Sequence, residues 1–250
     1  MTPRPWRNSD ADWDNWPVED YLAEVYAEVS GPDAEVIAHH SAYYRRIPAA
    51  SLARSVELGA GPNLYPLMLA ASVSRQVDAV DRSAANVAYL RRQLRDGPDP
   101  IWPPFHELCR RHNPAVPPLA EALSRVTVVH ADAFTLPPGR YDLASMHFVA
   151  EGATEDAGEF AAFCRAFVHT VRPGGHLVAA FIAGLRRYRN RTGPEYPGHP
   201  VDAGDVHRVF APHTDRLEVR HVEPDQNILD HDATGMVLLA ARRPVEAGGG

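Results

Sequence analysis

The feature that most constrains this chain of 250 residues is a pair of glycines directly after an apolar strand pattern. Residues 55–58 form that pattern, Gly59 and Gly61 follow, and a helix is expected over 62–74. Glycine permits a tight turn and a close approach of backbone N–H groups to a ligand. Asp81 closes the next apolar run, where an acidic residue can hold the two hydroxyl groups of a ribose. The pairing predicts a site for a nucleotide-type cofactor.

The next positions narrow the kind of cofactor. Leu64 occupies the place of the third glycine in a dinucleotide fingerprint, which disfavours pyrophosphate binding. Asp132 follows the strand pattern at 126–130 and can hydrogen-bond to an adenine amino group while Phe134 packs on the ring. The alternative is that Asp132 only caps the next turn. Features at the ends of three consecutive strands predict an adenosine cofactor without phosphates, S-adenosylmethionine.

Strand and helix patterns alternate along most of the chain. Strands are expected at 55–58, 76–80, 126–130, 141–148, 176–182, 217–222 and 234–241, and helices at 62–74, 83–95, 156–171 and 201–210. This alternation predicts an α/β fold: a Rossmann-like, seven-stranded, mostly parallel sheet with helices on both faces. Ligands of such sheets bind at the carboxyl ends of the strands.

The domain organisation follows from where this alternation begins and where it is interrupted. Residues 1–50 contain helix patterns at 18–29 and 33–44 but no strand pattern, which predicts an N-terminal helical cap or lid. The S-adenosylmethionine-binding core is expected over 51–245, with a proline-rich structured insertion at 96–118 that contains a short helix at 105–112. Residues 246–250 are expected to be a flexible tail.

Composition excludes several classes of function. The net charge of −7, without blocks of like charge, argues against nucleic acid as a partner. Apolar stretches at 64–73 and 176–185 are too short to span a bilayer, and no apolar run near the start predicts a signal peptide. Cys109 and Cys164 lie far apart, and the thirteen histidines have no zinc-type spacing, so we expect no metal. These features predict a cytoplasmic protein that acts on a small molecule; the oligomeric state stays open.

Several segments carry a resemblance to a known family. They are Asp20-Tyr21-Leu22 with Tyr26, His40-Ser41-Ala42, the loop from Gly59 to Tyr65, Asp81-Arg82-Ser83 with Asn86, the insertion with Trp102, and Arg172-Pro173-Gly174-Gly175. Together they resemble the class I S-adenosylmethionine-dependent methyltransferases. More narrowly, they resemble the family that includes the nicotinamide, phenylethanolamine, indolethylamine and thioether methyltransferases. The resemblance spans nearly the whole chain.

The resemblance implies a set of cofactor contacts. It places Tyr21, Tyr26, Tyr65 and Gly59 at the methionine end, Asp81 and Asn86 at the ribose and adenosine, Asp132 and Ala133 beside the adenine, and His147 in the cofactor wall. Without the resemblance, each tyrosine is equally well explained as an ordinary core residue.

The acceptor side is implied by fewer residues. Glu151 stands where amine-methylating members keep an acid, Tyr188 matches an aromatic residue that packs on the acceptor, and Asp232 lies near a second acid of some members. Phe181 departs from an acidic position of the nicotinamide-type enzymes, which favours a flatter and more apolar acceptor than nicotinamide. The arginine-rich stretch 186–199 is either a lid or a solvated loop.

These observations predict an enzyme that methylates a nitrogen of a small amine or N-heterocycle. Glu151 is the expected catalytic residue, which orients a protonated amine or takes its proton. Because all 25 basic residues are arginine and Ala, Pro and Gly are abundant, we expect a bacterial enzyme of specialised metabolism. Two alternatives stay open: an O-methyltransferase that uses His40 or His147 as base, and a non-catalytic protein that only binds the cofactor.

Overall fold

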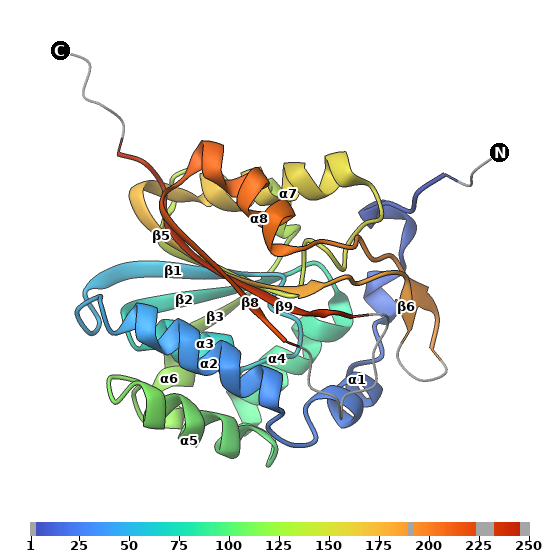
Figure 1. The fold of residues 1–250 in the computed structure, drawn as a ribbon. Helices are drawn as coiled ribbons and strands as arrows, with labels where there is room; N and C mark the ends of the chain where they lie inside the picture. Colours follow the sequence, from blue (N-terminus) through green and yellow to red (C-terminus); the bar gives the residue numbers. More distant parts are fainter. Residues whose placement is uncertain (1–3, 190–192, 224–232, 246–250) are drawn as a thin grey trace.

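A computed structural model describes residues 4–189, 193–223 and 233–245, and its centre is a seven-stranded sheet (Figure 1). The strands are β1 (Leu52–Leu58), β2 (Ser74–Asp81), β3 (Val126–His130), β4 (Tyr141–His147), β5 (Val171–Ala183), β8 (Asp215–Val222) and β9 (Gly235–Arg242). Their order is β3-β2-β1-β4-β5-β9-β8. Strands β1 to β5 pair in parallel, and β9 is antiparallel to both β5 and β8. The predicted Rossmann-like fold class is confirmed.

The order of the strands locates the ligand site. The chain moves from β1 outward to β2 and β3 and then returns to place β4 on the other side of β1. Val56 of β1 accordingly pairs with Asp78 of β2 on one side and Ala144 of β4 on the other. The connections leaving β1 and β4 diverge at this switch point, which leaves a crevice at the carboxyl ends of the strands.

Helices cover both faces of the sheet (Figure 1). One face carries α2 (Gly31–Tyr44), α3 (Tyr65–Ala71), α4 (Ala84–Asp96), α5 (Trp102–His112) and α6 (Leu119–Ser124), and the other carries α7 (Ala157–Thr170) and α8 (Ala203–Phe210). Two hydrophobic cores result, one on each face. Seven consecutive residues of β9 are buried, as expected for a strand that is covered on both faces.

Side-chain caps fix where two of these helices begin. The Ser83 hydroxyl accepts from the Asn86 N–H at 3.2 Å and starts α4 directly after β2. The Asp156 carboxylate accepts from the Glu159 N–H at 2.8 Å and starts α7. Each cap satisfies a backbone donor that has no partner within its helix.

Four local elements differ from the sequence prediction. Helix α6 and the two-residue strands β6 (Tyr188–Arg189) and β7 (Glu195–Tyr196) were not expected, because elements this short carry no measurable periodicity. Strand β5 begins before the predicted residue 176. The reason is that the Gly174 N–H donates to the Arg243 carbonyl, and the Arg243 N–H donates to the Gly175 carbonyl, so the glycine turn is itself paired.

The N-terminal region divides into two parts. Helix α2 packs beside α3 and α5, and so belongs to the helical layer of the sheet. The preceding segment, residues 6–16, which we name the strap, contains the short turns η1 (Asn8–Asp10) and η2 (Trp13–Asn15) and leads into α1 (Val18–Val25). In the described part of the chain, no helix combines the length and apolarity that a bilayer crossing requires.

Candidate cofactor and acceptor site

A cavity lies at the carboxyl ends of β1, β2 and β4. Its empty volume, open solvent at its mouth included, is about 800 Å³. The structure brings most of the predicted site residues into its lining: Tyr21, Tyr26, Gly59, Gly61, Asp81, Asn86, Asp132, Ala133, His147 and Tyr188. These positions come from six separate segments of the chain. Four of the segments meet because parallel strands end at one edge, and α1 and β6 supply the other two.

The two glycines after β1 have different spatial requirements. Gly59 and Gly61 adopt positive φ angles of +64° and +56°. A Cβ atom on Gly59 would lie 2.5 Å from Cγ1 of Val149, whereas one on Gly61 would meet no atom within 4 Å. Gly61 therefore presents bare backbone to open space in the cavity, as expected where a ligand approaches the main chain closely.

Asp81 has the contacts expected of a ribose-binding carboxylate. It accepts hydrogen bonds from the backbone N–H groups of Gly61 and Ser83, both at 2.7 Å, and from the Asn86 amide at 3.4 Å. A carboxylate has about four acceptor positions, so capacity remains for a hydroxyl donor. Burial raises the pKa of Asp81, while the backbone donors oppose that rise. The remaining acceptor position fits a ribose hydroxyl.

The residues predicted to contact adenine make a capping hydrogen bond and also line the cavity. The Asp132 carboxylate accepts from the Phe134 N–H at 2.9 Å, so the capping role is present. Asp132, Ala133 and Phe134 all line the cavity as well. Phe134 stacks on Phe163 of α7 at 3.7 Å between ring centroids, which fixes one face of this wall. Capping and cofactor contact are therefore compatible at Asp132.

At the end of the cavity predicted for the methionine group, two tyrosines line the cavity and a third is buried behind them. Tyr26 accepts from the Asn63 amide at 2.8 Å and lies edge-on to Tyr21, and both line the cavity. Tyr65 is fully buried outside the lining, where it stacks on Phe105. The structure therefore places Tyr65 behind Tyr26 as a support, away from the position that the resemblance implied.

A buried chain of polar groups stands under the cavity. His147 Nδ1 lies 2.8 Å from Glu57 Oε1, and His147 Nε2 lies 3.0 Å from His40 Nδ1. The Ser145 hydroxyl donates to the other carboxylate oxygen of Glu57. Burial lowers the pKa of His40 well below its usual value. Both nitrogens of His147, the histidine among the described lining residues, are therefore engaged.

Glu151 is present but set back from the cavity. Its side chain is fully buried, and Oε1 accepts from the Ile182 N–H at 2.8 Å. Oε2 has no hydrogen-bond partner among the described residues. Burial raises the pKa of Glu151 to about 8, and its charge acts on Tyr21 and Tyr188. The next residue, Gly152, lines the cavity, so Glu151 lies directly behind its wall.

Two predicted acceptor residues are not brought to the cavity. Phe181 packs against Phe160 and Phe210 in the core beneath α7 and α8. Alternate residues of a strand point to opposite faces, and Phe181 is on the face away from α2 and α3. Its assignment to the acceptor pocket is corrected accordingly. Asp232 lies outside the described residues. Within the described ranges, no group of His, Cys, Asp and Glu side chains is placed to hold a metal ion.

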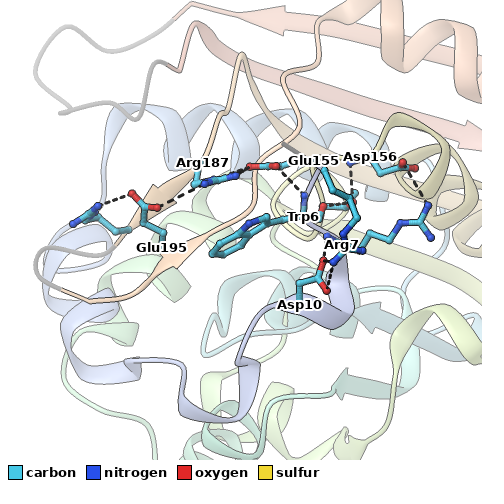
Figure 2. Close-up of polar contacts among 10 residues, drawn as sticks. Trp6, Arg7, Asp10, Glu155, Asp156, Arg187 and Glu195 are labelled. Atoms are coloured by element: carbon cyan, nitrogen blue, oxygen red, sulfur yellow. Dashed lines mark hydrogen bonds and ion pairs between the residues drawn. The ribbon is translucent and has the colours of Figure 1, made fainter. Parts of the chain in front are cut away.

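The strap contributes lining residues that the sequence did not predict: Asn8, Trp13 and Trp16. Figure 2 shows how it is fastened. The Trp6 N–H donates to the Glu155 carboxylate at 2.9 Å, and the Glu155 N–H donates to the Trp6 carbonyl at 2.8 Å. Arg187 pairs with the same carboxylate at 2.7 Å, and its guanidinium lies 4.5 Å from the Trp6 ring centroid. The concentration of three of the four tryptophans at positions 6, 13 and 16 was a usable signal in the sequence.

The arginine-rich stretch 186–199 also reaches the site. Tyr188 of β6 lines the cavity, while Arg187 and Arg189 pair with Glu195 of β7 at 3.9 and 2.5 Å. Arg187 therefore joins the strap to this hairpin (Figure 2). In the described part of this stretch, Tyr188 therefore lines the cavity while the Arg189 side chain is exposed.

Comparison with known proteins agrees with this geometry. The model of the NNMT/PNMT/TEMT family matches residues 8–243. No functionally curated protein matches significantly by sequence.

Solved structures agree in fold. The N-methyltransferase NodS from Bradyrhizobium japonicum WM9, in complex with S-adenosyl-L-homocysteine, superimposes with a TM-score of 0.56 at 16% identity, over 93% of this chain and 100% of that chain. The 1,6-didemethyltoxoflavin-N1-methyltransferase of Burkholderia thailandensis gives a TM-score of 0.51 at 18% identity, over 85% of this chain and 80% of that chain.

Proposed function

We propose that this chain, which belongs to the NNMT/PNMT/TEMT family of S-adenosylmethionine-dependent methyltransferases, transfers a methyl group to a nitrogen atom of a small amine or N-heterocycle. Family membership confirms the predicted enzyme class. The observation that carries the choice of nitrogen is the buried carboxyl group of Glu151 behind an aromatic cavity wall. Two structural neighbours are N-methyltransferases, which supports the same choice.

In this proposal the cofactor lies across the strand ends. Asp81 and Asn86 hold the ribose, Asp132 and Ala133 flank the adenine, and Tyr21 and Tyr26 contact the methionine end. The bare backbone at Gly61 and the remaining acceptor capacity of Asp81 support this placement. When bound, S-adenosylmethionine supplies a methyl group on a positively charged sulfur, open to attack by a nitrogen lone pair.

The protein's own contribution is alignment and the exclusion of water. Of the cap expected at 1–50, the strap and α1 are the part that lies over the cavity of the core at 51–245, which contains the insertion at 96–118. The tail expected at 246–250 lies outside the described residues. Holding two reactants in line can lower the activation free energy by up to about 7–11 kcal/mol. Trp16 of the strap and Tyr188 of β6 line the acceptor end of the cavity. The transfer of the methyl group needs no water molecule, so water can be excluded there.

Glu151 has one of two roles, depending on the acceptor. An amine that arrives protonated is oriented by the ionised form of Glu151 and gives up its proton to that carboxylate before methyl transfer. Because burial raises the pKa of Glu151 to about 8, this role strengthens as pH rises toward and above 8. A neutral heteroaromatic nitrogen needs no base, and Glu151 then only orients it. Methylation of oxygen is less well supported, because both nitrogens of His147 are engaged with Glu57 and His40.

The experiment is a transfer assay with labelled S-adenosylmethionine and a panel of amines, N-heterocycles and phenols, with product mass and the methylated atom determined. We expect N-methylated products from the wild type and from Arg208→Ala, an exposed control variant. For an amine acceptor, Glu151→Gln should lower the rate and flatten its pH profile. Products methylated only on oxygen would contradict the proposal. Cofactor binding without turnover of any compound would favour the non-catalytic alternative.

A further inference from the structure

One histidine of the cavity lining belongs to a buried chain of titratable groups. His147, at the end of β4, is 7% exposed and lies 2.8 Å from Glu57 of β1 and 3.0 Å from His40 of α2. Glu57 and His40 are buried, and the Ser145 hydroxyl also donates to Glu57. Among the described residues, His147 is the one ion-pair partner of Glu57. A carboxylate removed from water in this way strongly favours a positive charge beside it.

The chain can hold or release one proton while its side chains stay in place. A neutral imidazole has one donor and one acceptor nitrogen, whereas an imidazolium has two donors. With His147 neutral, its Nδ1 donates to Glu57 and its Nε2 accepts from Nδ1 of His40. With His147 protonated, both of its nitrogens donate, and Nδ1 of His40 accepts. Burial lowers the pKa of His40 well below its usual value, so the extra proton belongs to His147.

The order of the strands places His147 toward the sulfur end of the cofactor. In the proposed function, Asp132 after β3 flanks the adenine and Asp81 of β2 holds the ribose. The sheet continues from β2 through β1 to β4, so the part of the cofactor beyond the ribose belongs at the ends of β1 and β4. That part contains the sulfur, which is positively charged in S-adenosylmethionine and neutral in S-adenosylhomocysteine. Two positive charges in a site that excludes water repel each other strongly.

We infer that His147 exchanges one proton with solvent according to the charge on the cofactor sulfur, being neutral beside S-adenosylmethionine and protonated beside S-adenosylhomocysteine. The inference rests on the proposed function and assigns His147 the role of distinguishing the methyl donor from its product. The Glu57 carboxylate then faces one positive charge in either complex, from the sulfur or from His147. No covalent bond to carbon or sulfur changes in this exchange: His147 loses a proton to solvent when the donor is bound and regains one when the product is bound.

Other titratable groups pack around this chain and define the controls. Burial raises the pKa of three of them far enough that they stay largely protonated below about pH 7: Tyr44, Tyr65 and Glu151. Burial raises the pKa of Asp33 of α2 to about 6, and the charge of His147 acts on it. His39 lies 5.3 Å from His40 between ring centroids, and burial lowers its pKa. Asp33 and His39 are therefore the two neighbours whose titration has to be separated from that of His147.

The test compares the two forms of the cofactor across pH, without an acceptor. Each is titrated calorimetrically between about pH 7 and about pH 5.5, and the ratio of their affinities is followed. The size of the extra methyl group gives a constant ratio, whereas proton uptake by His147 changes it with pH. We expect the affinity for S-adenosylhomocysteine relative to S-adenosylmethionine to rise at least about fivefold as pH falls, within the limit of about tenfold per pH unit for one proton.

Variants and a spectroscopic readout assign the proton. The ratio should not change with pH in His147→Asn, whereas Asp33→Asn and His39→Gln should keep the wild-type change. Nuclear magnetic resonance of the wild type with isotope-labelled histidine should show a cationic His147 ring in the S-adenosylhomocysteine complex and a neutral ring in the S-adenosylmethionine complex.

Each contrary result identifies what is wrong. If both compounds bind with a ratio that is constant across pH, or if the His147 ring has the same charge in both complexes, the inference is overturned while the proposed function stands. A pH dependence that survives His147→Asn, or that disappears in Asp33→Asn, also overturns it. Should His147→Asn fail to fold, Glu57→Gln has to remove the dependence, and the ring signals of the wild type decide if neither variant folds. If neither compound binds the wild type, the proposed function and the inference fall together.

Discussion

Replacing Gly59 by alanine tests the steric account of the glycine turn. The new Cβ would lie 2.5 and 2.8 Å from the two methyl groups of Val149, at a φ of +64°. The left-handed conformation costs an alanine about 1–2 kcal/mol, and overpacking adds about 1–3 kcal/mol. We therefore expect Gly59→Ala to lower the free energy of unfolding by about 2–5 kcal/mol.

Gly61→Ala is the matched control, because its φ of +56° is similar but its Cβ meets no atom within 4 Å. Only the conformational cost of about 1–2 kcal/mol applies there. The same Cβ projects into open space in the cavity, so this variant should instead lose affinity for S-adenosylhomocysteine. Urea denaturation measures the first effect, and calorimetric titration measures the second.

A third variant isolates the contact. Val149→Ala removes the methyl groups that oppose the new Cβ, so the double variant with Gly59→Ala should recover about 1–3 kcal/mol in a double-mutant cycle. Equal destabilisation by the two glycine substitutions, or a coupling energy near zero, would refute the argument that Val149 makes Gly59 necessary.

Three further predictions address the strap, the buried polar chain and pH. Glu155→Ala should change global stability by only about 0–1 kcal/mol, since its pair with Arg187 is partly exposed, yet it should speed hydrogen exchange across residues 6–16; unchanged exchange would contradict the fastening role. Glu57→Gln replaces the carboxylate that lies 2.8 Å from His147 Nδ1 by a neutral amide and should cost about 1.5–3 kcal/mol in urea denaturation, the contribution of a hydrogen bond to a charged group, whereas no measurable loss would contradict that pairing. Burial raises the pKa of Glu151 to about 8 in the native state, from about 4.5 when unfolded. The native protein then keeps a proton that the unfolded chain has lost, so the free energy of unfolding falls as pH rises from about 5 to 8. Glu151→Gln lacks this contribution, and stability curves that stay parallel to the wild type across this range would contradict it.

The cofactor side of the site could be predicted because its residues stand at strand ends. Gly59, Asp81 and Asp132 each follow an apolar run directly, and parallel strands bring such positions to one edge whatever the details of packing. The two interior strands β5 and β9 were predictable because residues 177–183 and 236–241 are continuous apolar runs, as expected of strands covered on both faces. Only the short elements, such as α6 and the β6–β7 pair, escaped the pattern.

The acceptor side depends on contacts that no local pattern encodes. Trp13 and Trp16 reach the cavity because Trp6 is fastened to Glu155, which is 149 residues away in the chain. Phe181 was misplaced because a position transferred from a family does not reveal which face of β5 a side chain occupies. Tyr65 was predicted in the cavity lining but is buried behind Tyr26, because its position depends on how Phe105 of α5 packs against it.

Binding of S-adenosylhomocysteine tests the central claim, that the strand-end cavity holds the methyl donor, most directly. Calorimetric titration should show one site per chain in the wild type. It should show binding at least about tenfold weaker in Asp81→Ala, since hydrogen bonds to a charged group contribute about 1.5–3 kcal/mol. Phe181→Leu, in the core away from the cavity, should bind as the wild type does. Absence of binding to the wild type, or equal affinity in Asp81→Ala, would contradict the claim.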